Sequence, residues 1–204
     1  MNTKSSDSDI DFLKSFSLDT STKQKLIQYI DIIIDYKNKL NLVGESDKES
    51  IIQNLLIPSI ISTELVDRKN LIDIGSGSGV LGIPIKLVIN NVRLIICEKN
   101  LKKIAFINDV ILKLNINNVE IIPENLKNID KNRLQNVEQL LIRGIKLVNI
   151  YEMLLDKFPR GTSVVYFGSE EDTTTAPVQI LKTIPMPGNE NRKKPLFIYS
   201  LKLV

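Results

Sequence analysis

The sequence predicts an α/β fold, a mostly parallel sheet of seven strands that is preceded by helices and ends in an antiparallel hairpin. Three observations predict this fold. From residue 71 onward, short apolar runs alternate with helical patterns, as in a parallel sheet covered on both faces. A glycine-rich turn follows the first run and opens into a helix. The last two strand-like runs are joined by too few residues for a crossover helix, so they must be antiparallel.

The chain before the sheet has a helical pattern, and we divide the sequence into a helical extension over 1–66 and a sheet domain over 67–204. In the extension, Ser21–Gln24 has the spacing of a capping box, and apolar residues recur behind it at helical intervals. A second helical stretch over 51–66 should bend near Pro58, because proline has no amide hydrogen to donate.

The sheet domain contains strands and helices in alternation. The predicted strands cover residues 71–74, 93–97, 119–122, 139–142, 163–167, 178–184 and 196–203. The helix after the glycine turn begins near Gly82, with Pro84 in its first turn, where a missing amide hydrogen costs little. Further helices are expected along an apolar stripe over 104–114 and over about 146–158.

The turn between the first strand and its helix is the strongest candidate for a ligand site. Gly75, Gly77 and Gly79 allow positive φ and carry no Cβ, so with Val80 they can form a flat backbone floor under a ligand. Asp73 lies just inside this floor. An acid there is poorly suited to a pyrophosphate, but it can pair with a ligand ammonium group, directly or through water. This favours S-adenosylmethionine over NAD.

An acid at the end of the second strand supports the same site. Glu98 follows the first glycine at about the twenty-residue offset expected of a carboxylate that binds both ribose hydroxyls. The third strand leads into Pro123–Lys127, at the height where a nucleobase would lie. Two other interpretations stay open. The first is an NAD site, because Gly77–Gly82 matches the dinucleotide fingerprint G-x-G-x-x-G. The second is a tight strand-to-helix turn that binds no ligand.

The C-terminal hairpin is a second, independent indication. A parallel sheet finished by an antiparallel hairpin is typical of S-adenosylmethionine-dependent methyltransferases. The predicted fold class is therefore the Rossmann-like fold of the class I enzymes of this kind.

The residue types that the chain lacks restrict its chemistry. It has no histidine, and its single cysteine, Cys97, falls in a predicted buried strand. We therefore expect no metal site and no disulfide within the chain. No apolar run could span a bilayer, so we expect a cytoplasmic protein with no membrane partner. The net charge of +3 permits nucleic acid as a partner without requiring it, and we expect a monomer.

The methyl acceptor can be narrowed by chemistry. Methylation of a pyrimidine ring carbon needs a cysteine nucleophile, and Cys97 is placed away from the expected cavity. Methylation of an adenine amine usually goes with an Asn/Asp-Pro-Pro-aromatic motif, but Ile142–Ile145 stands in that place. The N7 atom of guanine exposes a lone pair with no proton to remove, so positioning alone can supply much of the rate. A site without histidine or cysteine therefore still permits this acceptor.

Five segments resemble one family. They are Asn41–Val43, Leu71–Gly77, Gly82–Lys86, Lys102–Lys103 and Asn118–Glu120. Over about residues 25–168 the chain resembles the bacterial small-subunit rRNA guanine-N7 methyltransferases RsmG, also called GidB. The resemblance implies transfer of a methyl group from S-adenosylmethionine to N7 of a guanine in 16S rRNA of the small ribosomal subunit.

The resemblance also implies cofactor contacts, at Gly75 and Val80 in the turn, at Leu126 and Lys127 after the third strand, and at Arg143 after the fourth. Glu98 replaces the usual ribose-binding aspartate of the family, and Lys127 stands where a carboxylate is usual. Arg143 is also the candidate catalytic residue, because it could contact the cofactor carboxylate, an RNA phosphate or the guanine edge.

Several positions depart from the family. Asn54 replaces a histidine, Ile57–Ser59 replaces an acid and a serine, and Phe167 replaces a lysine. These changes leave open a non-catalytic module that binds S-adenosylmethionine or RNA, and Gly77–Gly82 alone leaves open an NAD-dependent enzyme. The lysines at 99, 102 and 103 and the basic run Arg192–Lys194 could contact phosphates, although solvated surface lysines are ordinary.

Overall fold

The computed structural model describes residues 12–37, 42–45, 47–187 and 195–204. Their centre is one seven-stranded sheet in the order β3-β2-β1-β4-β5-β7-β6. The strands are β1 Asn70–Ile74, β2 Arg93–Cys97, β3 Val119–Ile122, β4 Gln139–Arg143, β5 Ser163–Gly168, β6 Val178–Pro185 and β7 Phe197–Leu203. Strands β1 to β5 pair in parallel, whereas β7 runs antiparallel to both β5 and β6. The predicted parallel sheet with an antiparallel C-terminal hairpin is confirmed.

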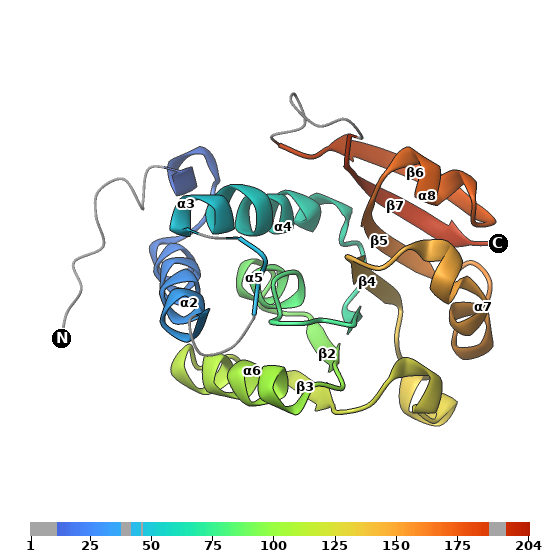
Figure 1. Cartoon of the computed structure of the whole chain (residues 1–204), viewed down its shortest axis with the longest axis horizontal. Helices are drawn as coiled ribbons and strands as arrows, with labels where there is room; N and C mark the ends of the chain where they lie inside the picture. The colour runs from blue at the N-terminus through green and yellow to red at the C-terminus, as the bar shows by residue number, and fades with distance from the viewer. Residues whose placement is uncertain (1–11, 38–41, 46, 188–194) are drawn as a thin grey trace.

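Helices cover both faces of the sheet (Figure 1). On one face lie α2 Thr20–Lys37, the helical run from α3 Lys48–Ile51 to α4 Ile57–Ile61, α5 Gly82–Val88 and α6 Leu101–Lys113. On the other lie α7 Leu147–Lys157 and the short α8 Glu170–Thr174. Each face has its own apolar core, because buried strand residues alternate between the two sides. No helix within the described ranges is long and apolar enough to cross a membrane.

The helical extension shares the core of the first face. Leu26, Ile30 and Leu56 are at most 1% exposed and belong to the same apolar cluster as Ile83 of α5 and Ile107 of α6. The division at residue 66 stays a prediction, but the extension contributes directly to the packing of the sheet.

The first helix begins differently from the prediction. Asp19 accepts hydrogen bonds from the amide and the hydroxyl of Thr22, at 2.8 and 2.9 Å, so Asp19 caps α2 and the helix begins at Thr20. The predicted capping box at Ser21–Gln24 is wrong, because an acid two residues earlier accepts the amide hydrogen instead.

The second helical stretch begins at Lys48 and departs from a regular α-helix just before Pro58. It passes from α3 through a π-helical turn, η2 Ile52–Leu56, into α4 and then a 3₁₀ turn, η3 Ser62–Leu65. Pro58 lies in the first turn of α4, directly after the π turn. The wider turn accommodates the residue that cannot donate to the carbonyl four residues before it.

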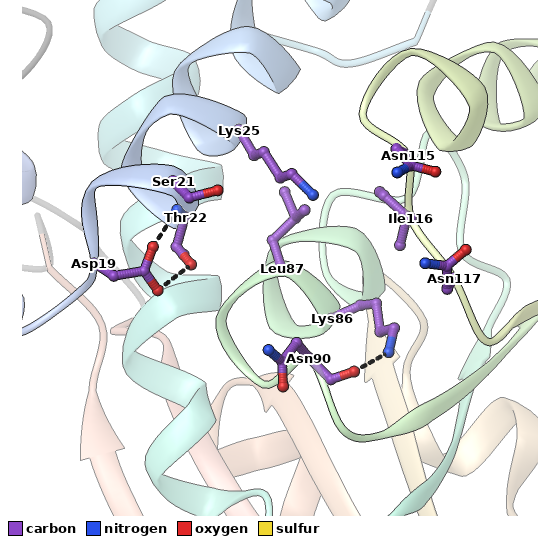
Figure 2. A pocket seen from close by; sticks show the side chains of 10 residues that line it. All are labelled: Asp19, Ser21, Thr22, Lys25, Lys86, Leu87, Asn90, Asn115, Ile116 and Asn117. Carbon is purple, nitrogen blue, oxygen red and sulfur yellow. Dashed lines mark hydrogen bonds between the residues drawn. The ribbon is translucent and has the colours of Figure 1, made fainter.

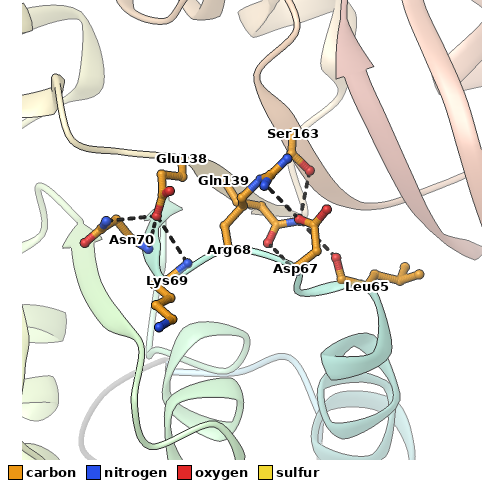
Figure 3. Close-up of polar contacts among 8 residues, drawn as sticks. All are labelled: Leu65, Asp67, Arg68, Lys69, Asn70, Glu138, Gln139 and Ser163. Carbon is orange, nitrogen blue, oxygen red and sulfur yellow. Dashed lines mark hydrogen bonds and ion pairs between the residues drawn. The ribbon is translucent and has the colours of Figure 1, made fainter.

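A polar cluster joins the extension to the amino-terminal edge of the sheet (Figure 3). The buried amide of Gln139 donates to the Leu65 carbonyl at 2.9 Å and to the Ser163 hydroxyl at 3.0 Å. Next to it, Glu138 accepts from the backbone amides of Lys69 and Asn70 at 3.2 and 3.0 Å. These contacts fix the connection that leads from η3 into β1.

Candidate functional site

The turn between β1 and α5 forms the floor that the glycines predict. Gly75, Gly77 and Gly79 have φ values of 65°, 62° and 77°, in the left-handed region that favours glycine. The amides of Gly75 and Ser76 donate to the carbonyl of Cys97 at 2.9 and 3.2 Å. The turn is therefore fixed to the carboxyl end of β2, which is the edge where ligands bind in sheets of this type.

Asp73 holds this turn from beneath. It is 2% exposed, and its Oδ2 accepts from the Ser76 hydroxyl at 2.6 Å and from the Gly82 amide at 2.9 Å. Burial raises the pKa of Asp73 to about 6, and these two hydrogen bonds oppose the rise. A Cβ at Gly82 would lie 2.7 Å from the same oxygen, so only glycine allows this close approach.

Glu98 lies at the end of β2 and contacts the other side of the floor. Its Oε2 accepts from the Gly77 amide at 2.9 Å, and its Oε1 accepts from the Asn100 amide at 2.8 Å. Each carboxylate oxygen keeps a further lone pair. The position suits a carboxylate that orients the floor and binds a ribose.

Two cavities meet at Gly75, which lines both. The first, of about 240 Å³, contains Glu98 and is otherwise mainly apolar. Its other lining residues are Ile74, Cys97, Lys99, Glu124, Asn125, Leu126, Ile145, Ile150 and Met153. The second, of about 230 Å³, lies between the floor and the helical extension and is lined by Leu42–Glu45, Leu55, Asp73, Gly75–Ser78, Val80, Leu81, Arg143 and Gly144. Both cavities lie at the carboxyl edge of the sheet, with Gly75 in the wall of each.

The structure brings together most of the predicted cofactor residues. Asp73, Gly75, Gly77 and Val80 line the second cavity. Glu98 and Leu126 line the first. Gly79 is buried within the turn and lines neither cavity, and its amide donates to the Ser76 carbonyl at 2.9 Å. The exposed Lys127 lines neither cavity.

Arg143 binds the π turn of the extension. Its Nη1 donates to the Leu55 carbonyl at 3.2 Å and to the Ser59 hydroxyl at 3.4 Å, and its Nη2 donates to the Asn54 carbonyl. In a regular α-helix the Asn54 carbonyl would accept from residue 58, but Pro58 has no amide hydrogen. The arginine thus supplies a hydrogen bond that the proline removes.

The same guanidinium also stacks on Phe167, with its Cζ 5.0 Å from the ring centroid. The sequence identified both Asn54 and Phe167 as departures from the family, and the structure places both against Arg143. Asn54 contributes a main-chain carbonyl and Phe167 an aromatic face. Phe167 and Arg143 also line a further cavity of about 270 Å³.

Further contacts at the floor were not predicted from the sequence. The buried hydroxyl of Ser59 lies 2.8 Å from the Val80 carbonyl, and the Tyr29 hydroxyl donates to the Ser78 carbonyl at 3.1 Å. The Ser78 hydroxyl in turn donates to the Leu42 carbonyl at 2.9 Å. No local pattern indicates these contacts, because each joins segments more than 20 residues apart.

Of the three lysines considered for phosphate contact, Lys99 lines the first cavity and Lys103 lies beside the floor. The Nζ of Lys103 lies 3.8 Å from the position that a Cβ of Gly77 would take. The run Arg192–Lys194 and Asn41 lie outside the described residues. Among the residues that the structure describes, no group of three or more acidic, cysteine or histidine side chains is arranged to hold a metal ion.

A larger cavity, of about 410 Å³, lies elsewhere (Figure 2). Its walls include the start of α2 and the segments that follow α5 and α6, so it opens near the amino-terminal edge of the sheet. There Lys86 donates to the carbonyls of Asn90 and Val92 and closes the end of α5. Cofactors of this fold class bind at the opposite edge, so size alone does not identify the site.

Comparison with known proteins relates the chain to one family. The family model of rRNA small subunit methyltransferase G, GidB, matches residues 22–179. A relative from Brachyspira hyodysenteriae, named ribosomal RNA small subunit methyltransferase G, is 33% identical over 51% of this chain and 52% of its own. A protein of the same name from Helicobacter bizzozeronii is 30% identical over 76% of this chain and 87% of its own. For several relatives the match spans only about half of their length.

A solved structure supports the fold. The S-adenosylmethionine-dependent methyltransferase of Aquifex aeolicus superposes with a TM-score of 0.56 at 13% identity, over 76% of this chain and 93% of that one. The predicted class I methyltransferase fold is confirmed. The family match extends over most of the chain, including β1 to β5 and the floor, and the resemblance seen in the sequence is confirmed with it. The chain belongs to the family of the rRNA small subunit methyltransferase G.

Proposed function

We propose that the protein transfers a methyl group from S-adenosylmethionine to N7 of a guanine in 16S rRNA, within the small ribosomal subunit in the cytoplasm. The observation that carries the proposal is the pair of cavities that meet at Gly75 above a side-chain-free floor, with Glu98 beside them. Family membership supports the same activity. The Aquifex structure of the same fold is itself named as an S-adenosylmethionine-dependent enzyme.

The residues present fit this cofactor. A nucleoside needs an apolar wall for its base and an acceptor for its ribose hydroxyls, and the first cavity offers Leu126 and Glu98. We propose that Gly75, Gly77, Gly79 and Val80 support the remainder of the cofactor. Asp73 organises the turn through Ser76 and Gly82, and in this proposal it supports the floor rather than the ligand directly.

The cofactor supplies an electrophilic methyl group, and the chain's own residues supply binding and orientation. The N7 lone pair of guanine needs no base, so positioning can supply most of the rate. The expectation that Cys97 lies away from the cavity is wrong, because the glycine turn bonds to its carbonyl and Cys97 lines the first cavity. Cys97 still does not suit the alternative of a covalent attack on a pyrimidine, because burial raises the pKa of its thiol to about 11. Arg143 lines the second cavity as well as binding the extension, and we retain it as the candidate for contact with substrate or cofactor.

Methylation of small subunits tests this proposal directly. Subunits from a strain without any 16S rRNA guanine-N7 methyltransferase are incubated with the protein and labelled S-adenosylmethionine. We expect label in a single nucleotide, identified by mass spectrometry of rRNA fragments as 7-methylguanosine. Label in another nucleotide would contradict the acceptor, and no label would contradict the activity.

A non-catalytic module is the second candidate, and the changed residues Asn54 and Phe167 favour it. Calorimetric titration separates the possibilities. Saturable binding of S-adenosylhomocysteine without methyl transfer would support the module, whereas saturable binding of NAD instead would support the dinucleotide alternative that Gly77–Gly82 leaves open.

A further inference from the structure

Ionisable groups of both signs line the second cavity. Three of its lining residues are ionisable, namely Asp73, Glu45 and Arg143. Two acids and one arginine around a small cavity suggest a ligand that carries charges of both signs. The amino-acid portion of S-adenosylmethionine is such a group, since it has an ammonium and a carboxylate on one carbon.

Asp73 is poorly placed to bind the ammonium. Its Oδ2 already accepts two hydrogen bonds from within the turn, only 2% of the residue is exposed, and burial raises its pKa to about 6. The sequence alone indicated Asp73 for this role, because the sequence does not reveal that Ser76 and Gly82 already donate hydrogen bonds to its carboxylate.

Glu45 has the opposite properties. It is half-buried in the wall of the cavity, and no hydrogen bond or ion pair joins its side chain to any other residue in the described part of the chain. The segment that carries it is held against the floor, because the Leu42 carbonyl accepts the Ser78 hydroxyl at 2.9 Å. A carboxylate in a cleft without a partner is only partly hydrated and is suited to a cationic ligand.

We propose that Glu45 binds the α-ammonium group of the cofactor's methionine portion. The inference rests on the cofactor named in the proposed function. If Glu98 and the first cavity receive the nucleoside, the methionine portion extends past Gly75 into the second cavity, where Glu45 and Arg143 lie. Glu45 meets the ammonium and Arg143 lies in the same wall as a partner for the carboxylate.

Calorimetry on the full chain tests this without RNA or turnover. The probes are S-adenosylhomocysteine and its deaminated analogue, which keeps the carboxylate and lacks the amino group. For the wild type, we expect loss of the amino group to weaken binding by about tenfold to a hundredfold, the range for a hydrogen bond to a charged group. Glu45→Gln should weaken the binding of S-adenosylhomocysteine by a similar factor, and this variant should bind the two probes with almost equal affinity.

Glu49→Gln is the matched control, because it removes the same charge from an exposed position in α3 outside the cavity. It should bind S-adenosylhomocysteine as the wild type does, and unchanged melting temperatures would show that both variants fold. This inference alone would be overturned if Glu45→Gln bound S-adenosylhomocysteine with wild-type affinity. It would also be overturned if loss of the amino group weakened binding to Glu45→Gln as much as binding to the wild type. Failure of the wild type to bind S-adenosylhomocysteine would overturn the cofactor assignment and this inference with it. Binding without methylation would overturn only the proposed activity.

Discussion

At the scale of single residues, the floor depends on backbone that no side chain covers. Gly77 shows this most clearly. The nearest atoms to a Cβ placed there are Lys103 Nζ at 3.8 Å and the Gly75 carbonyl oxygen at 4.0 Å, so the protein itself has room for a methyl group. Packing therefore does not explain the glycine at this position, whereas its φ of +62° does.

We expect Gly77→Ala to fold and to lose most of its affinity for S-adenosylhomocysteine, because the new methyl group would stand on the surface that the ligand needs. Its positive φ should cost about 1 kcal/mol in the free energy of unfolding. Gly161→Ala is the control, since Gly161 has a φ of +84°, has open space around it and lies in the turn before β5. It should lose similar stability and keep full affinity in calorimetric titration. Equal affinity in the two variants would contradict the floor assignment.

At the scale of elements, local patterns predicted the strands well. The predicted ranges 93–97 and 119–122 are the observed β2 and β3, because short buried runs bounded by polar turns leave little choice. The position of β7 between β5 and β6 was not predicted, since it depends on pairing between distant segments. Short elements such as α8 were also missed, because five residues carry too little periodicity.

The residues of the site show the same difference between local patterns, which could be predicted, and contacts between distant segments, which could not. Asp73 and Glu98 could be predicted because each lies at the carboxyl end of a strand, next to the turn that it holds. The contacts of Tyr29 and Ser59 with that turn could not be predicted, because they depend on how the extension packs. The guanidinium of Arg143 was expected at a ligand, and its bonds to helix carbonyls were visible only in three dimensions.

Arg143 should therefore stabilise the π turn between α3 and α4 as well as the second cavity. Arg143→Ala leaves the carbonyls of Asn54 and Leu55 without this donor, and we expect a loss of about 2 kcal/mol in the free energy of unfolding. Amide hydrogen exchange should become faster over residues 52–61 in particular. Arg133→Ala removes an arginine whose ion pairs with Glu120 and Glu124 are largely exposed, so it should cost less than about 1 kcal/mol. Equal losses and unchanged exchange over 52–61 would show that Arg143 does not hold the π turn.

At the scale of the whole molecule, the extension and the sheet depend on each other. Residues of α2 and α4 complete the apolar core over one face of the sheet, and their polar groups bind the outer side of the glycine turn. The extension also forms one wall of the second cavity through Leu42–Glu45 and Leu55. A site built in this way cannot keep its shape if the helices leave, even though Gly75, Gly77 and Gly79 of the floor all follow residue 66.

A chain that starts at residue 67 should therefore not fold alone. It would expose the apolar face that Leu26, Ile30 and Leu56 now cover, and each such side chain contributes about 1.5 to 3 kcal/mol when buried. The same apolar cluster also contains Leu13, Ile27, Tyr29, Ile33, Ile51, Ile52, Leu55 and Ile60 of the extension. The burial lost with all of these residues together is worth more than the roughly 5 to 15 kcal/mol that typically stabilises a domain. We expect no cooperative thermal transition by circular dichroism and no binding of S-adenosylhomocysteine. A chain that starts at residue 12 keeps all of these contacts and should retain both. A cooperative transition in the shorter chain would show that residues 67–204 form an independent domain, and the extension would then be a cap on a complete fold.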